Sequence, residues 1–329
     1  MERLDRKPFL NFIAAQRHPG NFRPAYEGFF APGAHVNVVH PFNEVAGGLG
    51  LHDHVIAPLA ASFDGLFRRD DIVMAGISDG QGWISATGYF VGRFSRDWLG
   101  IRATGELAYL RFGEFHRMQD GKAVESYIFF DIPELMLAAG QWPITDSPGK
   151  TRGFTGMIQG PASHDGILTT PQDPVEGAKS YRMVTEMLAK LATKNEAWRP
   201  FWHDNMVWYG PGAFGSFVGL ESFASFQVPF EATFEGWSGG SAGNGMTAHF
   251  TRFGEGNYVC SGGWPSLTGV QVKPFLDQPA SGKRVFMRVC DWWRREDDLL
   301  VENWVFVDIP HVLLQLGYDL FADIAEQAA

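Results

Sequence analysis

Several features that would define the class of a protein are scarce in this sequence of 329 residues. Its 2 cysteines, Cys260 and Cys290, are too few for a disulfide framework, and alone they cannot hold zinc. They fit buried thiols, with a disulfide between them as the less favoured alternative. No apolar run approaches the roughly 18 residues of a membrane span, and the N-terminal segment lacks the long apolar stretch of a signal peptide. We therefore expect a cytoplasmic protein without a membrane partner.

Positive charge is also in short supply. The chain has 27 Lys and Arg against 37 Asp and Glu, which gives a net charge of −10. Binding of nucleic acid needs a basic surface, so nucleic acid is not expected as a partner. Aromatic residues, in contrast, are abundant, at 14% of the chain with 28 Phe and 11 Trp. This content suits a cavity for a flat or apolar ligand as well as a core.

The chain contains an internal repeat. Residues 124–140 (VESYIFFDIPELMLAAG) and residues 301–317 (VENWVFVDIPHVLLQLG) are identical at eight of 17 positions, where chance would give about one. The register continues upstream without a gap, so that Arg111, Glu114 and Arg117 correspond to Arg288, Asp291 and Arg294. The sequence therefore predicts two copies of one fold, and a site in one half should have a counterpart in the other.

The order of patterns predicts two domains, residues 1–141 and 173–329, joined by a Pro/Gly-rich linker at residues 142–172. Each half reads as helices, then strands, then a short closing helix. This order predicts the α+β class, with helices packed over a strongly curved antiparallel sheet.

The last two strands of the first half form a predicted hairpin with a turn at residues 119–122. A three-residue turn with a bulge at Gly121 is preferred, because it pairs Met118 with Lys122 and places Glu114 and Ile128 on one face. A two-residue turn would shift the pairing by one residue and move Ile128 to the opposite face.

Each hairpin is followed by a repeated aspartate, Asp131 in the first half and Asp308 in the second. Both precede Ile-Pro, and Glu134 completes a capping box in the first half. The favoured interpretation is a helix cap, and catalysis is the alternative.

The hairpin segment RMQDGKAVESY at residues 117–127, followed by Asp131-Ile-Pro, resembles the closing strands of the SnoaL-like polyketide cyclase family within the nuclear transport factor 2-like superfamily. The second copy shows the same likeness in RREDDLLVENW at residues 294–304. The resemblance covers both halves but not the linker. It implies two tandem cone-shaped α+β barrel domains, each with an internal ligand pocket. It also implies pairing through the outer sheet faces, as an intrachain pseudo-dimer of the two domains or as a homodimer.

The resemblance further implies which positions form the site. Where the family's cyclases carry an acid/base Asp on the last strand, this chain has Ile128 and Val305. A second polar position of the family holds Glu114 and Asp291, which become the catalytic candidates. The predicted pocket positions are Asn37, His40, Trp83, Tyr89 and Ile128 in the first half, and Trp208, Tyr258, Trp264, Trp293 and Val305 in the second. The aromatic members could equally belong to the core.

Glu114 is the preferred base, because His116 lies two residues further on and therefore on the same strand face. Burial against aromatic rings would raise the pKa of the Glu114 carboxyl into the range useful for proton transfer, and His116 could orient it or donate to an oxyanion. The alternatives are an ion pair with a nearby arginine or a place at the domain interface. Asp291 has Trp293 as its same-face neighbour, so the first half is favoured as the active one.

A cluster of histidines, His35, His40, His52 and His54 with Asp53 among them, could suit a metal ion. No pair has the helical i, i+4 spacing, and the second half lacks counterparts. Loop and surface histidines are the preferred interpretation, and no metal is predicted.

Three functional hypotheses follow. The first is an enzyme that transfers protons on a small apolar or aromatic carbonyl compound, by cyclisation, isomerisation or hydration, without a cofactor. The second is a non-catalytic binding protein of the same fold, or a pair of halves of which one is active, which Ile128 and Val305 favour. The third is a scaffold that associates through its sheet faces.

Overall fold

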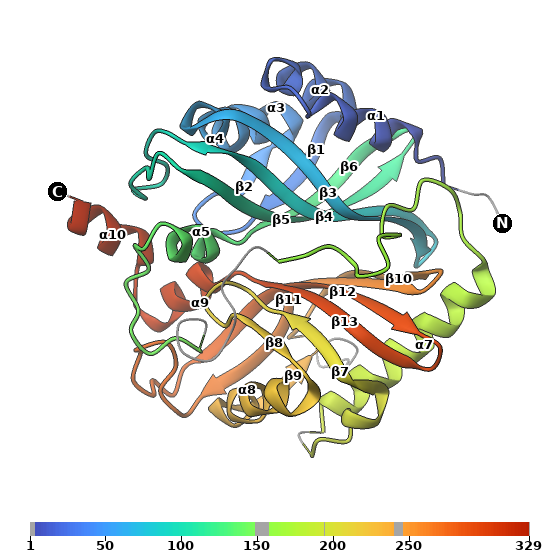
Figure 1. The fold of residues 1–329 in the computed structure, drawn as a ribbon, viewed down its shortest axis with the longest axis vertical. Helices are drawn as coiled ribbons and strands as arrows, with labels where there is room; N and C mark the ends of the chain where they lie inside the picture. The colour runs from blue at the N-terminus through green and yellow to red at the C-terminus, as the bar shows by residue number, and fades with distance from the viewer. Residues whose placement is uncertain (1–3, 149–157, 194, 240–245, 329) are drawn as a thin grey trace. The chain divides into compact units, whose positions relative to one another are not determined.

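The computed structural model describes residues 4–148, 158–193, 195–239 and 246–328. The chain divides into two compact units (Figure 1). Unit 1 comprises Met1–Trp142, Gln159–Pro171 and Phe321–Ala329, and unit 2 comprises Pro143–Ile158 and Gln172–Leu320. The segment that the sequence assigns to a linker is thus divided between the two units. Phe321–Ala329 belongs to unit 1 although it follows the second repeat.

Unit 1 is built on one sheet with the strand order β2-β1-β6-β5-β4-β3. Its strands are β1 (Phe30–Val38), β2 (Asn43–Ala46), β3 (Phe63–Ser78), β4 (Gln81–Phe94), β5 (Leu107–Gln119) and β6 (Lys122–Phe130). Its helices are α1 (Lys7–Ala15), α2 (Phe22–Phe29), α3 (Gly47–Leu51), α4 (Ala57–Ser62), α5 (Ile132–Ala138) and α10 (Leu320–Ala328), with short helical turns at Pro19–Asn21 and His52–Ile56.

Unit 2 repeats this architecture with the strand order β10-β11-β12-β13-β7-β8, and β9 also pairs with β11. Its strands are β7 (Trp202–Tyr209), β8 (Ser216–Val218), β9 (Phe234–Gly239), β10 (His249–Glu255), β11 (Tyr258–Gln271), β12 (Arg284–Glu296) and β13 (Leu299–Val307). Its helices are α7 (Pro174–Leu191), α8 (Leu220–Thr233) and α9 (Ile309–Leu316), with a short turn at Arg199–Phe201.

The predicted α+β class with two tandem units of helices over a curved sheet is confirmed (Figure 1). Two details differ from the prediction. The sheets are curved but open rather than closed barrels, because the strand path of unit 1 ends at β2 and β3 and does not return on itself. The sheets are also mixed, because β1 pairs with β6 and β7 with β13 in parallel. Long connections through the rest of each unit permit this parallel pairing, which a tight turn would forbid.

The hairpin of β5 and β6 has a different turn from the predicted one, but its side chains lie on the predicted faces. Gln119 pairs with Lys122, so the turn is the two-residue Asp120–Gly121, and the predicted three-residue turn is wrong. Both turn residues have positive φ, 50° and 74°, which an Asp-Gly sequence adopts readily. A register shift between Arg117 and Met118 then restores the predicted faces.

After this shift, Glu114 pairs with Ile128 and His116 pairs with Ser126, so these four residues share one face, as predicted. The hairpin of β12 and β13 has the same two-residue turn and a register shift between Arg294 and Arg295. The repeat is therefore structural as well as sequential, down to the position of the bulge.

The repeated aspartates cap helices, as expected. Asp131 accepts a hydrogen bond from the backbone N–H of Glu134, and Asp308 accepts one from that of His311, each at 3.2 Å. The reciprocal half of the predicted capping box is replaced, because the Asp131 N–H donates to the carbonyl of Arg111. Glu134 instead accepts from the Tyr89 hydroxyl at 3.4 Å.

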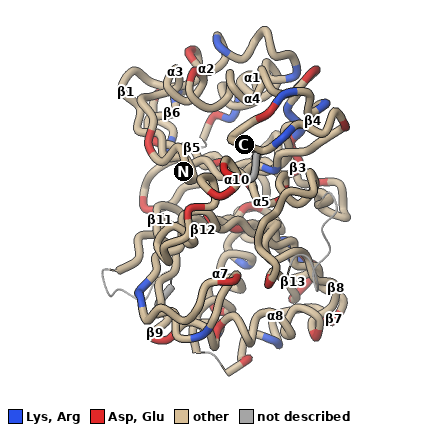
Figure 2. The backbone as a smooth tube through the Cα atoms, turned by 90° about the vertical axis from the view of Figure 1, so that its left-hand side faces the viewer, with Lys and Arg blue, Asp and Glu red and all other residues tan. Residues whose placement is uncertain are grey.

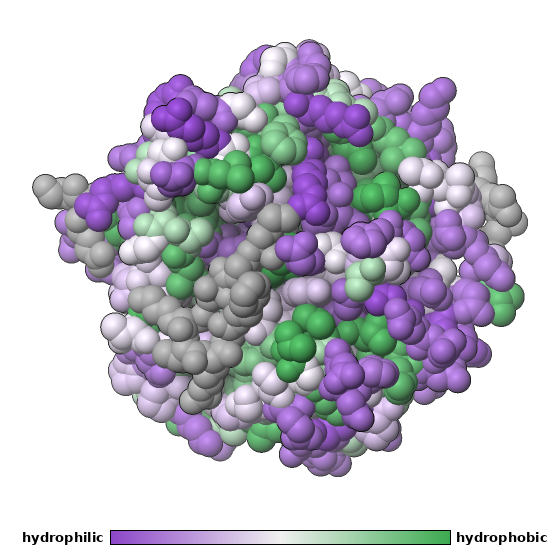
Figure 3. Space-filling model, in the orientation of Figure 1, coloured by the Kyte–Doolittle hydropathy of each residue, from purple (hydrophilic) through white to green (hydrophobic). Residues whose placement is uncertain are grey.

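Charged residues of both signs are distributed along the backbone of both units. Lys and Arg segments are interspersed with Asp and Glu segments in both units (Figure 2). On the face drawn in Figure 3, hydrophobic side chains form separate patches among hydrophilic ones. Within the described ranges, no helix is long and apolar enough to cross a membrane. The cytoplasmic location stays a prediction.

Candidate active site in unit 2

A cavity of about 370 Å³ lies inside unit 2, between the sheet of β10–β13 and the helices α7 and α8. This volume is in the range of small-ligand pockets. Its walls are mainly apolar and rich in aromatic rings, among them Trp198, Trp208, Phe223, Phe226, Phe230 and Trp293. The predicted pocket residues Trp208, Trp293 and Val305 all line it.

The period of two along the strands explains which sheet residues reach the cavity. On β12 the lining residues are the alternate positions Met287, Val289, Asp291 and Trp293, and on β13 they are Asn303, Val305 and Val307. Successive side chains of a strand point to opposite faces, so these residues share the face that α7 and α8 cover. Among the described lining residues, Asp291 is the one carboxylate.

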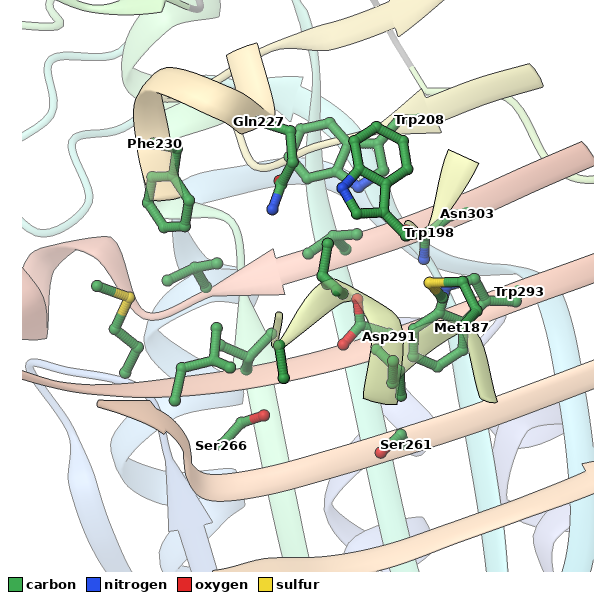
Figure 4. A pocket seen from close by; sticks show the side chains of 18 of the residues that line it. Met187, Trp198, Trp208, Gln227, Phe230, Ser261, Ser266, Asp291, Trp293 and Asn303 are labelled. Carbon is green, nitrogen blue, oxygen red and sulfur yellow. The ribbon is translucent and has the colours of Figure 1, made fainter. Parts of the chain in front are cut away.

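Asp291 occupies the middle of this face. It pairs with Ser261 of β11 on one side and with Val305 of β13 on the other. In Figure 4 its carboxylate lies between Trp198 and Trp208 on one side and Ser261 and Ser266 on the other. A carboxylate is thus held in a mainly apolar cavity with hydroxyl groups nearby, which is an arrangement suited to proton transfer.

A polar network lines the cavity next to Asp291. The Arg252 Nε donates to the Ser261 Oγ at 3.1 Å, and the Ser261 Oγ lies 3.1 Å from Nδ1 of His249. The opposite ring nitrogen of His249, Nε2, lies 3.0 Å from the Ser266 Oγ. All four residues line the cavity.

The charges of this network are set by burial. Burial and the neighbouring Arg252 charge lower the pKa of His249 to about 4, so His249 is neutral at pH 7. Burial also lowers the pKa of Arg252, while the negative charge of Asp291 acts in the opposite direction. An arginine remains charged in proteins, so Arg252 is the cation of the site.

Irregularities in β10 and β11 bring the network together. Ser261 and Ser266 are five residues apart, which in a regular strand would place them on opposite faces. A register shift between Gly263 and Leu267 turns Ser266 toward the cavity. Glycine permits this path, because a Cβ on Gly263 would lie 2.6 Å from the Ser266 Cα.

Two further donors line the cavity. The indole N–H groups of Trp198 and Trp293 are buried and have no hydrogen-bond partner among the described residues. A buried donor without an acceptor is costly, so a ligand with an acceptor oxygen would gain by pairing with either group.

The corresponding position in unit 1 differs. Glu114 is 5% exposed and forms an ion pair with Arg68, and its Oε2 lies 3.5 Å from Nε2 of His116. Arg68 also binds Asp70, with Nη2 and Oδ1 2.6 Å apart. Glu114 is therefore part of a buried charge cluster, which is the ion-pair alternative that the sequence left open.

The electrostatics of Glu114 contradict the prediction of a raised pKa. Burial by itself raises the pKa of this carboxyl, but the positive charge of Arg68, together with His116, outweighs burial and lowers it to about 2. A carboxylate with such a low pKa is a weak base, because it holds a proton poorly at neutral pH.

Aromatic rings surround the Glu114 cluster. The rings of Phe12 and Phe29 stack at 4.3 Å, and the His116 ring lies 5.6 Å from Phe9 and 5.1 Å from Phe29. The Arg68 guanidinium lies 4.3 Å from the centre of the Phe112 ring. The helices α1 and α2 thus bring side chains against this face of the unit 1 sheet.

Several predicted pocket residues lie on the faces opposite the candidate carboxylates. Trp83 and Tyr89 pair with Arg117 and Arg111, which alternate with Glu114 along β5. Asn37 is registered with Tyr127, next to Ile128, and therefore also lies opposite. These three side chains do not share a face with Glu114.

The remaining predicted residues are distributed as follows. Ile128 is buried and pairs with Glu114 on the neighbouring strand, so the two side chains share a face. His40 follows β1, with its ring 5.6 Å from that of Phe321. In unit 2, Tyr258 pairs with Arg294, and the Arg288 guanidinium lies 4.3 Å from the Trp264 ring, so both aromatic residues lie away from Asp291.

The histidine segment of unit 1 is held by local contacts. Asp53 forms an ion pair with Arg23, and its Oδ1 lies 2.6 Å from Nδ1 of His52. In the described part of the chain, no three His, Cys, Asp or Glu side chains are grouped as metal ligands would be. The two cysteines are buried free thiols.

Sequence reasoning missed His249, Arg252, Ser261 and Ser266. The signal for Ser261 was the strand pairing that places it opposite Asp291, which requires the register of β11. Ser266 and His249 lie beyond register shifts, where a period of two no longer predicts the face.

Part of unit 2 matches a known protein family. Residues 184–303, which contain the network and Asp291, match the family model of the SnoaL-like domain. The chain carries a SnoaL-like domain. The match to this SnoaL-like domain covers most of unit 2, and unit 1 repeats its strand order and hairpin.

Solved structures similar to this chain correspond to about one half of it. A candidate SnoaL-like polyketide cyclase from Jannaschia sp. CCS1 is 18% identical and has a TM-score of 0.38, over 45% of this chain and 96% of its own. TsrD from Streptomyces laurentii is 22% identical with a TM-score of 0.35, over 43% and 96%. An LEH-like epoxide hydrolase from M. tuberculosis is 15% identical with a TM-score of 0.33, over 46% and 98%. The comparison with curated proteins finds no match.

Proposed function

We propose that the SnoaL-like domain in unit 2 binds a small apolar or aromatic carbonyl compound and transfers a proton on it, with Asp291 as the acid/base. The observation that carries the proposal is the position of Asp291 on the wall of an aromatic cavity of about 370 Å³. A flat compound fits such walls, and its polar end would meet the few polar groups of the lining.

The chemistry follows from the groups present. The Asp291 carboxylate would take a proton from the carbon next to the carbonyl, and negative charge would then develop on the carbonyl oxygen. Hydroxyl and indole N–H donors of the lining can stabilise that oxygen. Return of the proton to another carbon gives isomerisation, and attack of the carbanion on a second carbonyl gives cyclisation. Neither step requires a cofactor.

Unit 2 is thus the proposed active half, in place of unit 1. Glu114 and His116 were the sequence-based candidates, and their role in catalysis stays untested. The ion pair with Arg68 and the low pKa of Glu114 favour Asp291 over Glu114 as the base. Asp291 is moreover a lining residue of the cavity.

A non-catalytic binding function is the second candidate. It is favoured by Val305, an apolar residue that lines the cavity at the position where the resemblance implies an acid/base. In this case the cavity would hold the same class of compound, and the carboxylate would only orient it.

Hydrogen exchange of a bound ketone separates the two candidates. The probe is 2-tetralone, an aromatic ketone with acidic hydrogens next to its carbonyl, incubated with the full chain in D₂O. Deuterium incorporation above the buffer rate, followed by NMR, is expected for the parent protein. Asp291→Asn should reduce this protein-dependent exchange at least about 100-fold, as loss of a general base does.

The matched control is Asp298→Asn, an exposed aspartate in the turn of the same hairpin that pairs with Lys179. This variant should exchange 2-tetralone like the parent. Binding of 2-tetralone without accelerated exchange would establish the binding function instead. Full exchange activity in Asp291→Asn would refute Asp291 as the base.

A further inference from the structure

The chemistry of its members favours one direction for the hydrogen bonds of the network beside Asp291. An arginine side chain can only donate hydrogen bonds. The Arg252 Nε donates to the Ser261 Oγ at 3.1 Å, and the Arg252 Nη2 lies 3.5 Å from Nδ1 of His249. The Ser261 hydroxyl, 3.1 Å from the same Nδ1, can pass its own hydrogen to that nitrogen. The neighbouring guanidinium therefore favours Nδ1 as the acceptor of the ring.

A neutral imidazole carries one hydrogen, so acceptance at Nδ1 places that hydrogen on Nε2. Nε2 lies 3.0 Å from the Ser266 Oγ and donates to it. The opposite tautomer could donate from Nδ1 to the Ser261 Oγ, but its Nδ1–H would also lie beside the Arg252 Nη2, which is itself a donor, so the guanidinium disfavours that tautomer. The Ser266 hydroxyl thus accepts from His249 and keeps its own hydrogen for another acceptor.

Ser266 is well placed to use this hydrogen on a ligand. It is 5% exposed and lines the cavity, as does every other member of the network. The cationic Arg252 at the start of the chain polarises each bond in the same direction, which strengthens the last donor. A hydroxyl fixed in this way prefers an acceptor oxygen to a second donor.

We infer that Ser266 donates a hydrogen bond to the oxygen of the bound compound, and that His249 is a positioning residue that fixes the direction of this bond. The inference rests on the proposed function and specifies its ligand as a compound with an acceptor oxygen, such as a ketone or its enolate. A compound whose polar group can only donate would be disfavoured.

Two probes of nearly the same shape test the inference on the full chain. 2-Tetralone has the acceptor oxygen and tetralin lacks it, and binding of both can be followed by tryptophan fluorescence. Ser266→Ala should weaken binding of 2-tetralone about five-fold, which is the effect of one hydrogen bond, and leave tetralin unchanged. Ser266→Thr keeps the hydroxyl and should retain the affinity.

A spectroscopic readout tests the bond itself. The carbonyl stretching band of bound 2-tetralone should lie at lower wavenumber in the parent protein than in Ser266→Ala. His249→Gln retains an N–H donor near Ser266 and should keep the band position, whereas His249→Leu should shift the band toward that of Ser266→Ala.

The outcomes are separable from those of the proposed function. An unchanged band and an unchanged affinity in Ser266→Ala would overturn the inference, while loss of exchange in Asp291→Asn would still support the proposed function. Equal weakening of tetralin and 2-tetralone would also overturn it, because packing would then be the cause. Failure of the parent to bind 2-tetralone would overturn both.

Discussion

Replacement of Glu114 by glutamine should destabilise unit 1 without abolishing the proposed proton transfer. The variant keeps the size of the side chain and removes its charge, which leaves the buried Arg68 with Asp70 as its remaining acidic partner in the cluster. The interaction that is lost lies inside unit 1, whereas the proposed base, Asp291, lies in unit 2.

The expected magnitude follows from the pKa of the group. Its decrease from 4.5 to about 2 corresponds to about 3 kcal/mol of stability, at about 1.4 kcal/mol for each pKa unit. Removal of one partner from a buried ion pair typically costs about 3–5 kcal/mol. Because Asp70 still compensates Arg68, the lower end, about 3 kcal/mol, is expected.

The effect should depend on pH with a defined sign. The pKa of Glu114 is lower in the folded state than in the unfolded chain, so the ionised group stabilises the fold above the unfolded pKa of 4.5. This contribution is lost as the pH falls toward about 2. The stability difference between parent and Glu114→Gln should therefore be complete above pH 4.5 and shrink below it.

Amide hydrogen exchange is the appropriate assay, because it reports on the strands of each unit separately. Peptides from β3, β4 and β5 should lose protection in Glu114→Gln, and peptides from β12 and β13 should not. Glu125→Gln is the matched control, since it removes the half-buried ion pair with Arg117 on the same hairpin and should cost less than about 1 kcal/mol.

A specific result would refute this reasoning. If Glu114→Gln kept full protection in β3–β5 and lost exchange of 2-tetralone, Glu114 would be the catalytic base that the sequence suggested. The site would then have to be assigned to unit 1.

Three further changes have expected outcomes. Burial raises the pKa of Asp71 to about 6, so ionisation of this carboxyl destabilises the fold as the pH rises above 3.8; Asp71→Asn should stabilise unit 1 by about 2–3 kcal/mol at pH 7 and by little below pH 4, as measured by urea unfolding. Gly263→Ala should displace Ser266, because the new Cβ would lie 2.6 Å from its Cα, and should lower affinity for 2-tetralone in fluorescence titration. Asp173→Ala should remove the cap bond to the Val175 N–H and cost about 1 kcal/mol, seen as faster exchange in the first turn of α7.

The strand faces could be predicted from the sequence even where the turn could not. The prediction placed Glu114, His116 and Ile128 on one face, and the structure agrees although its turn is one residue shorter. The bulge that restores the register is a local irregularity without a distinctive residue signal. Alternation of apolar and polar residues constrains the face more strongly than turn composition constrains the turn.

The candidate site was only partly accessible to sequence reasoning. Asp291, Trp293 and Val305 follow from the repeat and from strand periodicity, and all three line the cavity. His249 and Ser266 do not, because register shifts separate them from the regular parts of β10 and β11. Their roles depend on distances between strands that are remote in sequence.

The preference between the two halves was the part that the sequence could not decide. Glu114 with His116 beside it was the better-equipped pair by composition, and the partner that changes its chemistry, Arg68, is 46 residues away. Strand pairing brings that arginine onto the carboxylate, and helix packing brings rings of α1 against the arginine.

The sequence by itself determined the duplication, the α+β class, the helix caps and the faces of the closing hairpins, because these depend on local periodicity and on residues close together in the chain. The tertiary structure alone decided that Asp291 borders a cavity and that Glu114 forms an ion pair with Arg68. Charge compensation and free volume are sums over contacts between distant segments, so no short stretch of sequence contains them.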